Sequence, residues 1–358
     1  MYFFDLGLTP FEAGKQVGSS DLVKKNRLFF SSEDSQQIPQ EILEEKKAFA
    51  AKCEKICRTV YPSILEEMEG FCSSSGIAME EWSTRFFTIY AFPPFQGCTC
   101  LAVGGENGYL ARNSDFLPQA ASLCSSYVFH FPETKSFFAN STTPTQMEDG
   151  VNEDGLAVGL TFLYPTVRKP GLHAGLLVRY LLEHCQDVPE AIKALKHLPI
   201  SSMQTLTLAD KSGRIAVVEC NCEEVEVVSP NKENFLAATN HLQSNKMCRY
   251  QIPMPDLIHS QERLQTVQNA CLNKKEEIDI EWLKKLFSGQ MGFLCQYQPE
   301  DGMDTLWSVI YDLKGRNSFV PAKSMARGIS KGNALFLLNN RRKHDGNGDK
   351  KRQGPFIR

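Results

Sequence analysis

The stretch that decides the fold is GCTCLAVGGENGYLARNSDF, residues 97–116. Two short runs typical of β-strands flank its centre, and the segment between them ends in Asn107-Gly108, a strong signal for a β-hairpin turn. A turn centred near residue 106 or 107 places Cys98 opposite residues 114 to 116, with cross-strand neighbours about 5 Å apart. The hairpin is therefore expected to bring Arg112, Asn113 and Asp115 close to the Cys98 thiol.

This cluster suits a cysteine nucleophile. A nearby cation favours the thiolate over the thiol, and a carboxylate can orient an amine or hold the cation in place. A structural interpretation competes, in which Cys98 is a small core residue and Arg112 forms an ion pair with Asp115. The hairpin alone favours this second interpretation.

Helices and strands alternate in blocks around the hairpin. Helical spacing of apolar residues precedes it, and strand patterns separated by turns follow it. The predicted helices are 39–60, 62–71, 78–89, 174–185, 188–196, 259–272 and 280–287. The predicted strands include TCLAV, GYLAR, SYVFHF, LAVGLTFL, TLTLA, RIAVVEC, EVEVV, FLAAT, TLWSVIYDL and SFVPA. Such blocks predict an α+β fold of stacked antiparallel sheets covered by helices, in one structural domain.

Composition excludes several classes of protein. The chain has 358 residues, 23% of them charged, with a net charge of −3, which offers no overall field to attract nucleic acid or an anionic membrane. No cationic and apolar leader opens the sequence, and no apolar run approaches the length of a membrane span. We therefore expect a soluble cytoplasmic protein. A basic C-terminal tail is predicted at 336–358, because its last 18 residues hold seven Lys or Arg against two Asp.

The twelve cysteines lack the spacing of a disulfide scaffold, so most of them are expected to be buried apolar residues. Cys98-x-Cys100 and Cys220-x-Cys222 could offer four thiolates to zinc, but their spacing differs from that of zinc knuckles. His241 could instead serve Cys98 as a papain-like base. For the two cysteine pairs, core packing is favoured over zinc binding. The papain-like role of His241 ranks well behind the hypothesis given below for Cys98. No metal or cofactor is predicted.

Six motifs carry a resemblance to a known family. They occur in the order GCTC, ARNSDF, MEDGVNEDGLAVGLTFL, ATNHL, SQERL and TLWSVIYDL. Over about residues 90–325 the chain resembles the choloylglycine hydrolase and penicillin acyltransferase group of N-terminal nucleophile (Ntn) hydrolases. It is most similar to the acyl-CoA:6-aminopenicillanate acyltransferase branch, peptidase family C45. The resemblance implies a four-layer αββα sandwich, in agreement with the blocks of helices and strands.

The resemblance also implies self-cleavage of the Gly97–Cys98 bond. In that family the residue aligned with Cys98 becomes a new N-terminus, and its α-amino group, with a pKa of about 7.7–8.0, serves as the base for its own thiol. Glycine at 97 would ease attack of the thiol on the preceding carbonyl. The expected products are a helical segment, 1–97, and a catalytic chain from 98, with its core at 98–335. The two chains are expected to stay associated.

Further roles follow by similarity. Arg112 would support the thiolate or the substrate carbonyl, and Asp115 would bind the new α-amino group. Asn240 matches a family asparagine that donates to the oxyanion, and Arg263 matches a second family arginine.

The remaining candidates are expected to contact the oxyanion or the substrate. They are Asn113 and Thr161, whose backbone N–H is a candidate oxyanion donor. The Thr161 side chain departs from the asparagine of bile-salt hydrolases and the tyrosine of penicillin V acylases, so neither substrate can be carried over.

The expected function is a self-processing amidohydrolase that cleaves a linear amide of a small N-acyl substrate through an acyl-thioester. One alternative is an acyltransferase that passes the acyl group, for example from an acyl-CoA, to an amine. Another is a non-catalytic binding member of the fold. No nucleic-acid or membrane partner is expected, and a homo-oligomer is possible. The sequence does not reveal the acyl and amine parts of the substrate.

Overall fold

The structure is a computed structural model that describes residues 1–30, 39–92, 97–106, 108–230, 232–253, 255–275, 277–297 and 302–315, together with the backbone of two further strands, 317–321 and 333–337. None of the helices in these ranges is both long and apolar enough to cross a membrane. The predicted tail falls mostly outside the described residues, although the last strand extends to Leu337.

Two sheets form the centre of the molecule. The larger has eight strands in the order β1-β4-β5-β6-β7-β8-β9-β10, and the smaller has six in the order β11-β2-β3-β12-β13-β14. The first comprises β1 (Tyr2–Leu6), β4 (Ser125–Phe129), β5 (Phe137–Ser141), β6 (Asp149–Asn152), β7 (Leu156–Phe162), β8 (Gln204–Asp210), β9 (Ile215–Cys220) and β10 (Val225–Val228). The second comprises β2 (Gly97–Val103), β3 (Tyr109–Phe116), β11 (Phe235–Ala238), β12 (Asp304–Asp312), β13 (Asn317–Pro321) and β14 (Asn333–Leu337).

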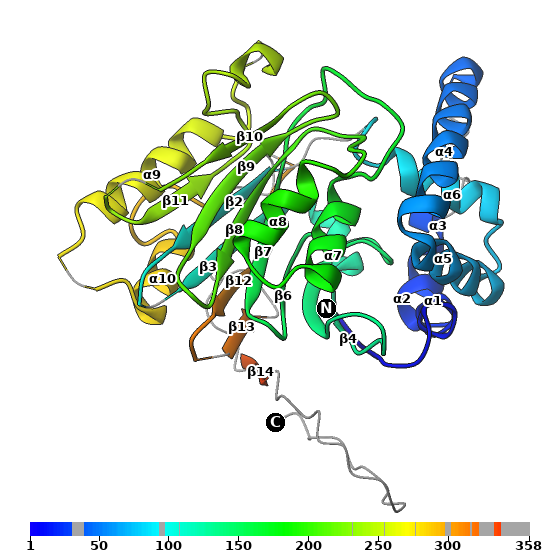
Figure 1. Cartoon of the computed structure of the whole chain (residues 1–358), viewed down its shortest axis with the longest axis horizontal. Coiled ribbons are helices and arrows are strands. Elements are labelled where there is room, and N and C mark those ends of the chain that lie inside the picture. Colours follow the sequence, from blue (N-terminus) through cyan, green and yellow to red (C-terminus); the bar gives the residue numbers. More distant parts are fainter. Residues whose placement is uncertain are drawn as a thin grey trace, which may run out of the picture.

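Helices cover the outer face of each sheet, as Figure 1 shows. Helices α7 (Ala174–His184) and α8 (Val188–Leu195) pack on the larger sheet, and α9 (Ser260–Leu272) and α10 (Ile280–Phe287) pack on the smaller one, while β2 and β3 face β7 and β8 across the interior. The α+β class and the four-layer αββα sandwich predicted from the sequence are therefore confirmed.

The N-terminal segment adds a group of helices beside the sandwich (Figure 1). They are α1 (Pro10–Gly18), α2 (Asp21–Lys25), α3 (Arg27–Phe30), α4 (Gln40–Val60), α5 (Pro62–Ser75) and α6 (Met79–Thr88). Pro62 at the first turn of α5 separates it from α4, as expected from the sequence. Glycine permits the close packing of α1 on α5, because a Cβ at Gly14 would lie 1.9 Å from the backbone oxygen of Glu67.

One prediction for this segment is wrong: it is not entirely helical. Its first residues form β1, which pairs in parallel with β4 and buries Phe4 and Leu6. The eight-stranded sheet is consequently not purely antiparallel. The main core cluster contains side chains from both the N-terminal segment and this sheet, so the regions before and after residue 97 share one core.

The decisive hairpin has the expected register. Cys98 lies opposite Ser114, within the predicted range of 114 to 116, and Cys100 lies opposite Arg112. Asp115 lies opposite Gly97.

Candidate active site

The hairpin divides the predicted cluster between the two faces of the smaller sheet. Successive side chains of a strand point to opposite faces. Cys98, Cys100 and Arg112 face the larger sheet, where a Cβ at Gly159 of β7 would lie 2.9 Å from Cys100 Sγ. Asp115 belongs to the other face, which is covered by helices. The residues that surround the thiol therefore differ from those that surround the backbone of Cys98.

Two N–H groups point at the sulfur of Cys98, which is fully buried. Arg112 Nη2 lies 3.2 Å from Cys98 Sγ, and the backbone N–H of Phe162 also hydrogen-bonds to the sulfur. Burial is the main cause that raises the pKa of this thiol, and the guanidinium of Arg112 opposes that rise. The carboxylates of Glu148 and Asp115 raise the pKa further. The surroundings of the thiol thus oppose its ionisation.

Arg112 is fixed by bonds from every nitrogen of its guanidinium. Nε donates to Leu160 O (2.8 Å), Nη1 to Asp149 Oδ2 (2.9 Å), and Nη2 also lies 3.4 Å from Glu148 Oε2. Asp149 is held in turn by the side chains of Asn140, Trp307 and Tyr311. The guanidinium therefore has a single orientation, with one edge against the thiol.

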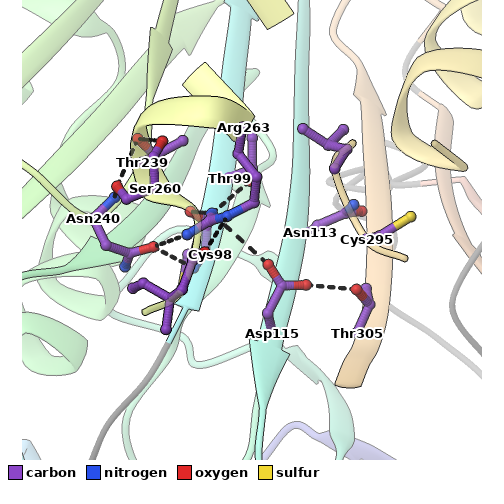
Figure 2. A network of polar contacts seen from close by, with 12 residues as sticks. Cys98, Thr99, Asn113, Asp115, Thr239, Asn240, Ser260, Arg263, Cys295 and Thr305 are labelled. Atoms are coloured by element: carbon purple, nitrogen blue, oxygen red, sulfur yellow. Dashed lines mark hydrogen bonds and ion pairs between the residues drawn. The ribbon is translucent and has the colours of Figure 1, made fainter. Parts of the chain in front are cut away.

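A second arginine holds the backbone of Cys98, as Figure 2 shows. Arg263, on α9, is fully buried and donates through Nη1 to Cys98 O and to Thr99 Oγ1 (2.8 Å). Its Nη2 donates to Asn240 Oδ1 (2.8 Å), the same oxygen that accepts the backbone N–H of Cys98 (2.8 Å). Asn240 Nδ2 donates to Phe162 O (2.9 Å). The structure thus brings Asn240 and Arg263 together at the backbone of Cys98.

Asp115 lies beside the Gly97–Cys98 bond on the helix-covered face (Figure 2). Thr305 Oγ1 donates to Asp115 Oδ1 (2.6 Å), and Asp115 Oδ2 lies 3.8 Å from Arg263 Nη1 without a hydrogen bond among the described residues. Burial raises the pKa of this carboxyl group, and Arg263 opposes the rise. One oxygen of Asp115 is therefore open to a new donor at this position.

Asn113 requires a correction. Its side chain points away from the thiol and donates through Nδ2 to Phe287 O (3.1 Å), at the end of α10. The hairpin brings its backbone close, but the alternation of faces turns the amide toward the helices.

Thr161 also requires a correction. It pairs with Thr205 of β8, and its hydroxyl lies 3.5 Å from Thr205 O. Backbone N–H groups alternate between the two edges of a strand, and Leu160 N bonds to Glu148 O on the opposite edge. The next N–H on that edge belongs to Phe162, which contacts the thiol. The backbone N–H at the thiol is therefore that of Phe162 and not that of Thr161.

Other residues around Arg112 and Asn240 were not anticipated. Glu148 and Asp149 lie in the quoted MEDG motif but approach Arg112 only because the sheets stack, and Ser260 Oγ accepts the backbone N–H of Asn240 (2.8 Å). Adjacent acidic residues that begin a buried strand were the available signal for the first two. Ser260 opens the quoted SQERL motif, but nothing in the sequence indicated its contact with Asn240.

The alternatives to an N-terminal nucleophile find no matching geometry. Nδ1 of His241 contacts Ser260 Oγ (2.7 Å) and Thr239 Oγ1 (3.2 Å), whereas Arg112 and Phe162 contact the thiol. All twelve cysteines are described and free, and no group of three or more His, Cys, Asp or Glu within the described ranges could hold a metal ion.

Comparisons with known proteins cover most of this region. The family model described as acyl-coenzyme A:6-aminopenicillanic acid acyl-transferase matches residues 103–326, more than half of the chain. This match begins after Cys98 and includes Arg112, Asp115, Asn240 and Arg263. A search of curated proteins finds no match.

Two of the solved structures that are similar to this chain are the following. Penicillin V acylase from Agrobacterium tumefaciens is 16% identical with a TM-score of 0.43, and the alignment covers 62% of this chain and 82% of the acylase. A mutant conjugated bile acid hydrolase from Clostridium perfringens is 13% identical with a TM-score of 0.46, covering 72% of this chain and 97% of the hydrolase.

Proposed function

Because the chain belongs to the acyl-coenzyme A:6-aminopenicillanic acid acyl-transferase family, we propose that it is a self-processing amidohydrolase whose nucleophile is Cys98. One observation carries this proposal: polar side chains contact both the thiol and the backbone nitrogen of Cys98. Arg112 contacts the sulfur, and Asn240 accepts the N–H. A core cysteine would need an acceptor for its N–H, but it would not need a guanidinium at its sulfur.

Self-processing would cut the chain between Gly97 and Cys98. The Cys98 thiol attacks the Gly97 carbonyl carbon, and its proton passes to the peptide nitrogen, which leaves as the α-amino group of Cys98. Water then hydrolyses the Gly97 thioester and frees the sulfur. This gives chains of 97 and, since 358 − 97 = 261, 261 residues. Asp115 is the proposed partner of the new amine, because its Oδ2 is open beside this bond.

The proposed reaction uses the freed amine as the base. With a pKa near neutrality it takes the proton of the thiol, and the thiolate attacks the carbonyl carbon of an N-acyl amide. The amine product leaves with that proton, and water hydrolyses the acyl-thioester. The proposed oxyanion donors are the Asn240 amide and the Phe162 N–H, and one such donor contributes about a hundredfold or more in rate.

Intact mass of the purified protein tests self-processing. We expect chains of 97 and 261 residues that purify together, and a single uncut Cys98→Ala chain. A single 358-residue wild-type chain without a free N-terminal cysteine would falsify the self-processing proposal. A folded protein whose Cys98 resists thiol electrophiles would instead indicate the non-catalytic binding alternative.

The family description favours acyl transfer as a second candidate function, because it names an acyl-transferase. The same acyl-thioester would then react with an amine instead of water. A screen of N-acyl amides, followed by product analysis with and without an added amine, separates the two functions. Acylated amine that grows in proportion to the added amine would favour transfer.

A further inference from the structure

One N–H group of Arg112 is shared between the candidate nucleophile and an acidic residue. Nη2 lies 3.2 Å from Cys98 Sγ and 3.4 Å from Glu148 Oε2, and all three side chains are fully buried. Ser114 Oγ, directly across the hairpin from Cys98, donates to the same oxygen of Glu148 (3.3 Å). The carboxylate therefore lies beside the thiol.

Glu148 is also held in this position. Thr142 donates to its other oxygen, Oε1, through both the backbone N–H (3.0 Å) and the hydroxyl (2.7 Å). Four donors on three residues thus fix the carboxylate beside the guanidinium. A carboxylate that served only to neutralise a buried arginine would not need to share the N–H that meets the sulfur, since Asp149 already pairs with Nη1 of Arg112.

The charges in this cluster oppose ionisation of the thiol. One guanidinium already faces two carboxylates, Glu148 and Asp149, so a thiolate would add a third negative charge in a dry interior. The titratable and charged groups around Cys98 come from several elements. They are Arg112, Cys100 and Asp115 on the smaller sheet, Glu148 just before β6, Asp149 at the start of β6, Arg263 on α9, Tyr90 after α6, and Tyr297 after α10.

We infer that Glu148 is a positioning residue that restrains the nucleophile, because it shares Arg112 Nη2 with Cys98 and keeps a negative charge beside the sulfur. The inference rests on the proposed role of Cys98. In the uncleaved chain this restraint keeps the thiol protonated. The α-amino group released by cleavage takes up the thiol proton, brings a positive charge to the same residue and offsets the restraint, so the thiolate that attacks a substrate forms only after processing.

Titration of Cys98, followed by NMR of ¹³Cβ-labelled cysteine, tests the inference. The resonances of Cys98 and Cys100 are assigned with their alanine variants, and intact mass fixes the state of each sample so that only like forms are compared. Glu148→Gln removes a negative charge close to the sulfur. It should therefore lower the midpoint of the Cys98 titration by about one pH unit or more. Glu148→Asp, whose shorter side chain withdraws the charge, should lie between that variant and the wild type.

Two controls separate charge from loosened packing. Glu153→Gln removes a carboxylate from the turn after β6, and the Cys98 midpoint should not move. Cys100, on the same face, should stay protonated over the titrated range in Glu148→Gln as in the wild type, whereas a loosened core would let both cysteines ionise earlier.

A Cys98 midpoint at or above the wild-type value in either folded Glu148 variant overturns the inference. Should the glutamine variant unfold, the aspartate variant decides alone. Absence of wild-type cleavage would defeat self-processing but leave this titration interpretable.

Discussion

The backbone N–H of Cys98 donates to Asn240 Oδ1 over 2.8 Å, while Nδ2 of the same amide donates to Phe162 O over 2.9 Å. Asn240 therefore links the candidate nucleophile on the smaller sheet to the end of β7 on the larger one. After cleavage between Gly97 and Cys98, the N–H held by Asn240 would belong to the new α-amino group. The amide would then position this amine and present its own NH₂ group to the reacting carbonyl.

Asn240→Ala should lower kcat about 100- to 1000-fold, because it removes an oxyanion donor and the acceptor for Cys98 N and Arg263 Nη2. The measurement is kcat on an N-acyl amide found by screening, together with thermal unfolding. Asn273→Ala, at the exposed end of α9, is the matched control and should retain wild-type kcat. A folded Asn240→Ala enzyme within threefold of the wild type would refute the assigned role.

The Gly97 site is predicted to tolerate little volume. A Cβ there would lie 3.3 Å from Asp115 Cβ and 3.4 Å from Met303 Sδ, so the branched side chain of Gly97→Val would displace the bond to be cut. We expect intact mass to show an uncut chain. Gly7→Val is the control, because its Cβ would meet only His130 Cβ at 3.9 Å, and it should be processed normally. Complete cleavage of Gly97→Val would contradict the assigned geometry.

A buried charge cluster joins the segment before residue 97 to helix α7 beyond it. Arg179 of α7 pairs with Glu67 of α5 (2.6 Å) and Glu183 (2.9 Å), and Tyr61 donates to Glu183 (2.6 Å). Arg179→Met leaves two buried carboxylates without their cation, which should cost about 3–5 kcal/mol in free energy of unfolding. Urea denaturation measures this loss.

The control for Arg179 is an exposed pair of the same type. Arg58, 63% exposed, contacts Glu54 at 2.9 Å, and Arg58→Met should change the free energy of unfolding by at most about 1 kcal/mol. Equal effects of the two substitutions would show that the buried cluster does not hold the N-terminal segment.

Local pattern was enough to predict the hairpin, most helices and the approach of Arg112, because turn residues and apolar periodicity act over short distances. Asn113 was placed wrongly because proximity along a hairpin ignores the alternation of faces that turns it to Phe287 O. The Phe162 N–H and the acidic pair Glu148 and Asp149 depend on how two sheets stack, which short motifs do not encode. The strand β1 was missed because its partner β4 lies more than a hundred residues away.

His173 provides a test of the packing between α6 and α7 through pH. It precedes α7 and lies between Phe86 and Tyr90, with ring centroids 4.9 Å and 5.4 Å away, and within the described structure neither ring nitrogen has a hydrogen-bond partner. Burial lowers the pKa of His173 to about 3. The folded protein therefore keeps this imidazole neutral at a pH where the unfolded chain protonates it.

The sign of the pH effect follows from this difference. Below a pH of about 6.5 the unfolded state binds a proton that the folded state does not, so His173 makes stability fall as the pH falls toward 3, by about 1.4 kcal/mol per unit. His173→Phe should remove that slope. Urea unfolding of the wild type and of His173→Phe from pH 7 to 4 measures the slope of stability against pH for each protein. The difference between the two slopes removes the contribution of the other titrating groups. A His173→Phe slope equal to the wild-type slope would show that His173 is protonated in the folded protein.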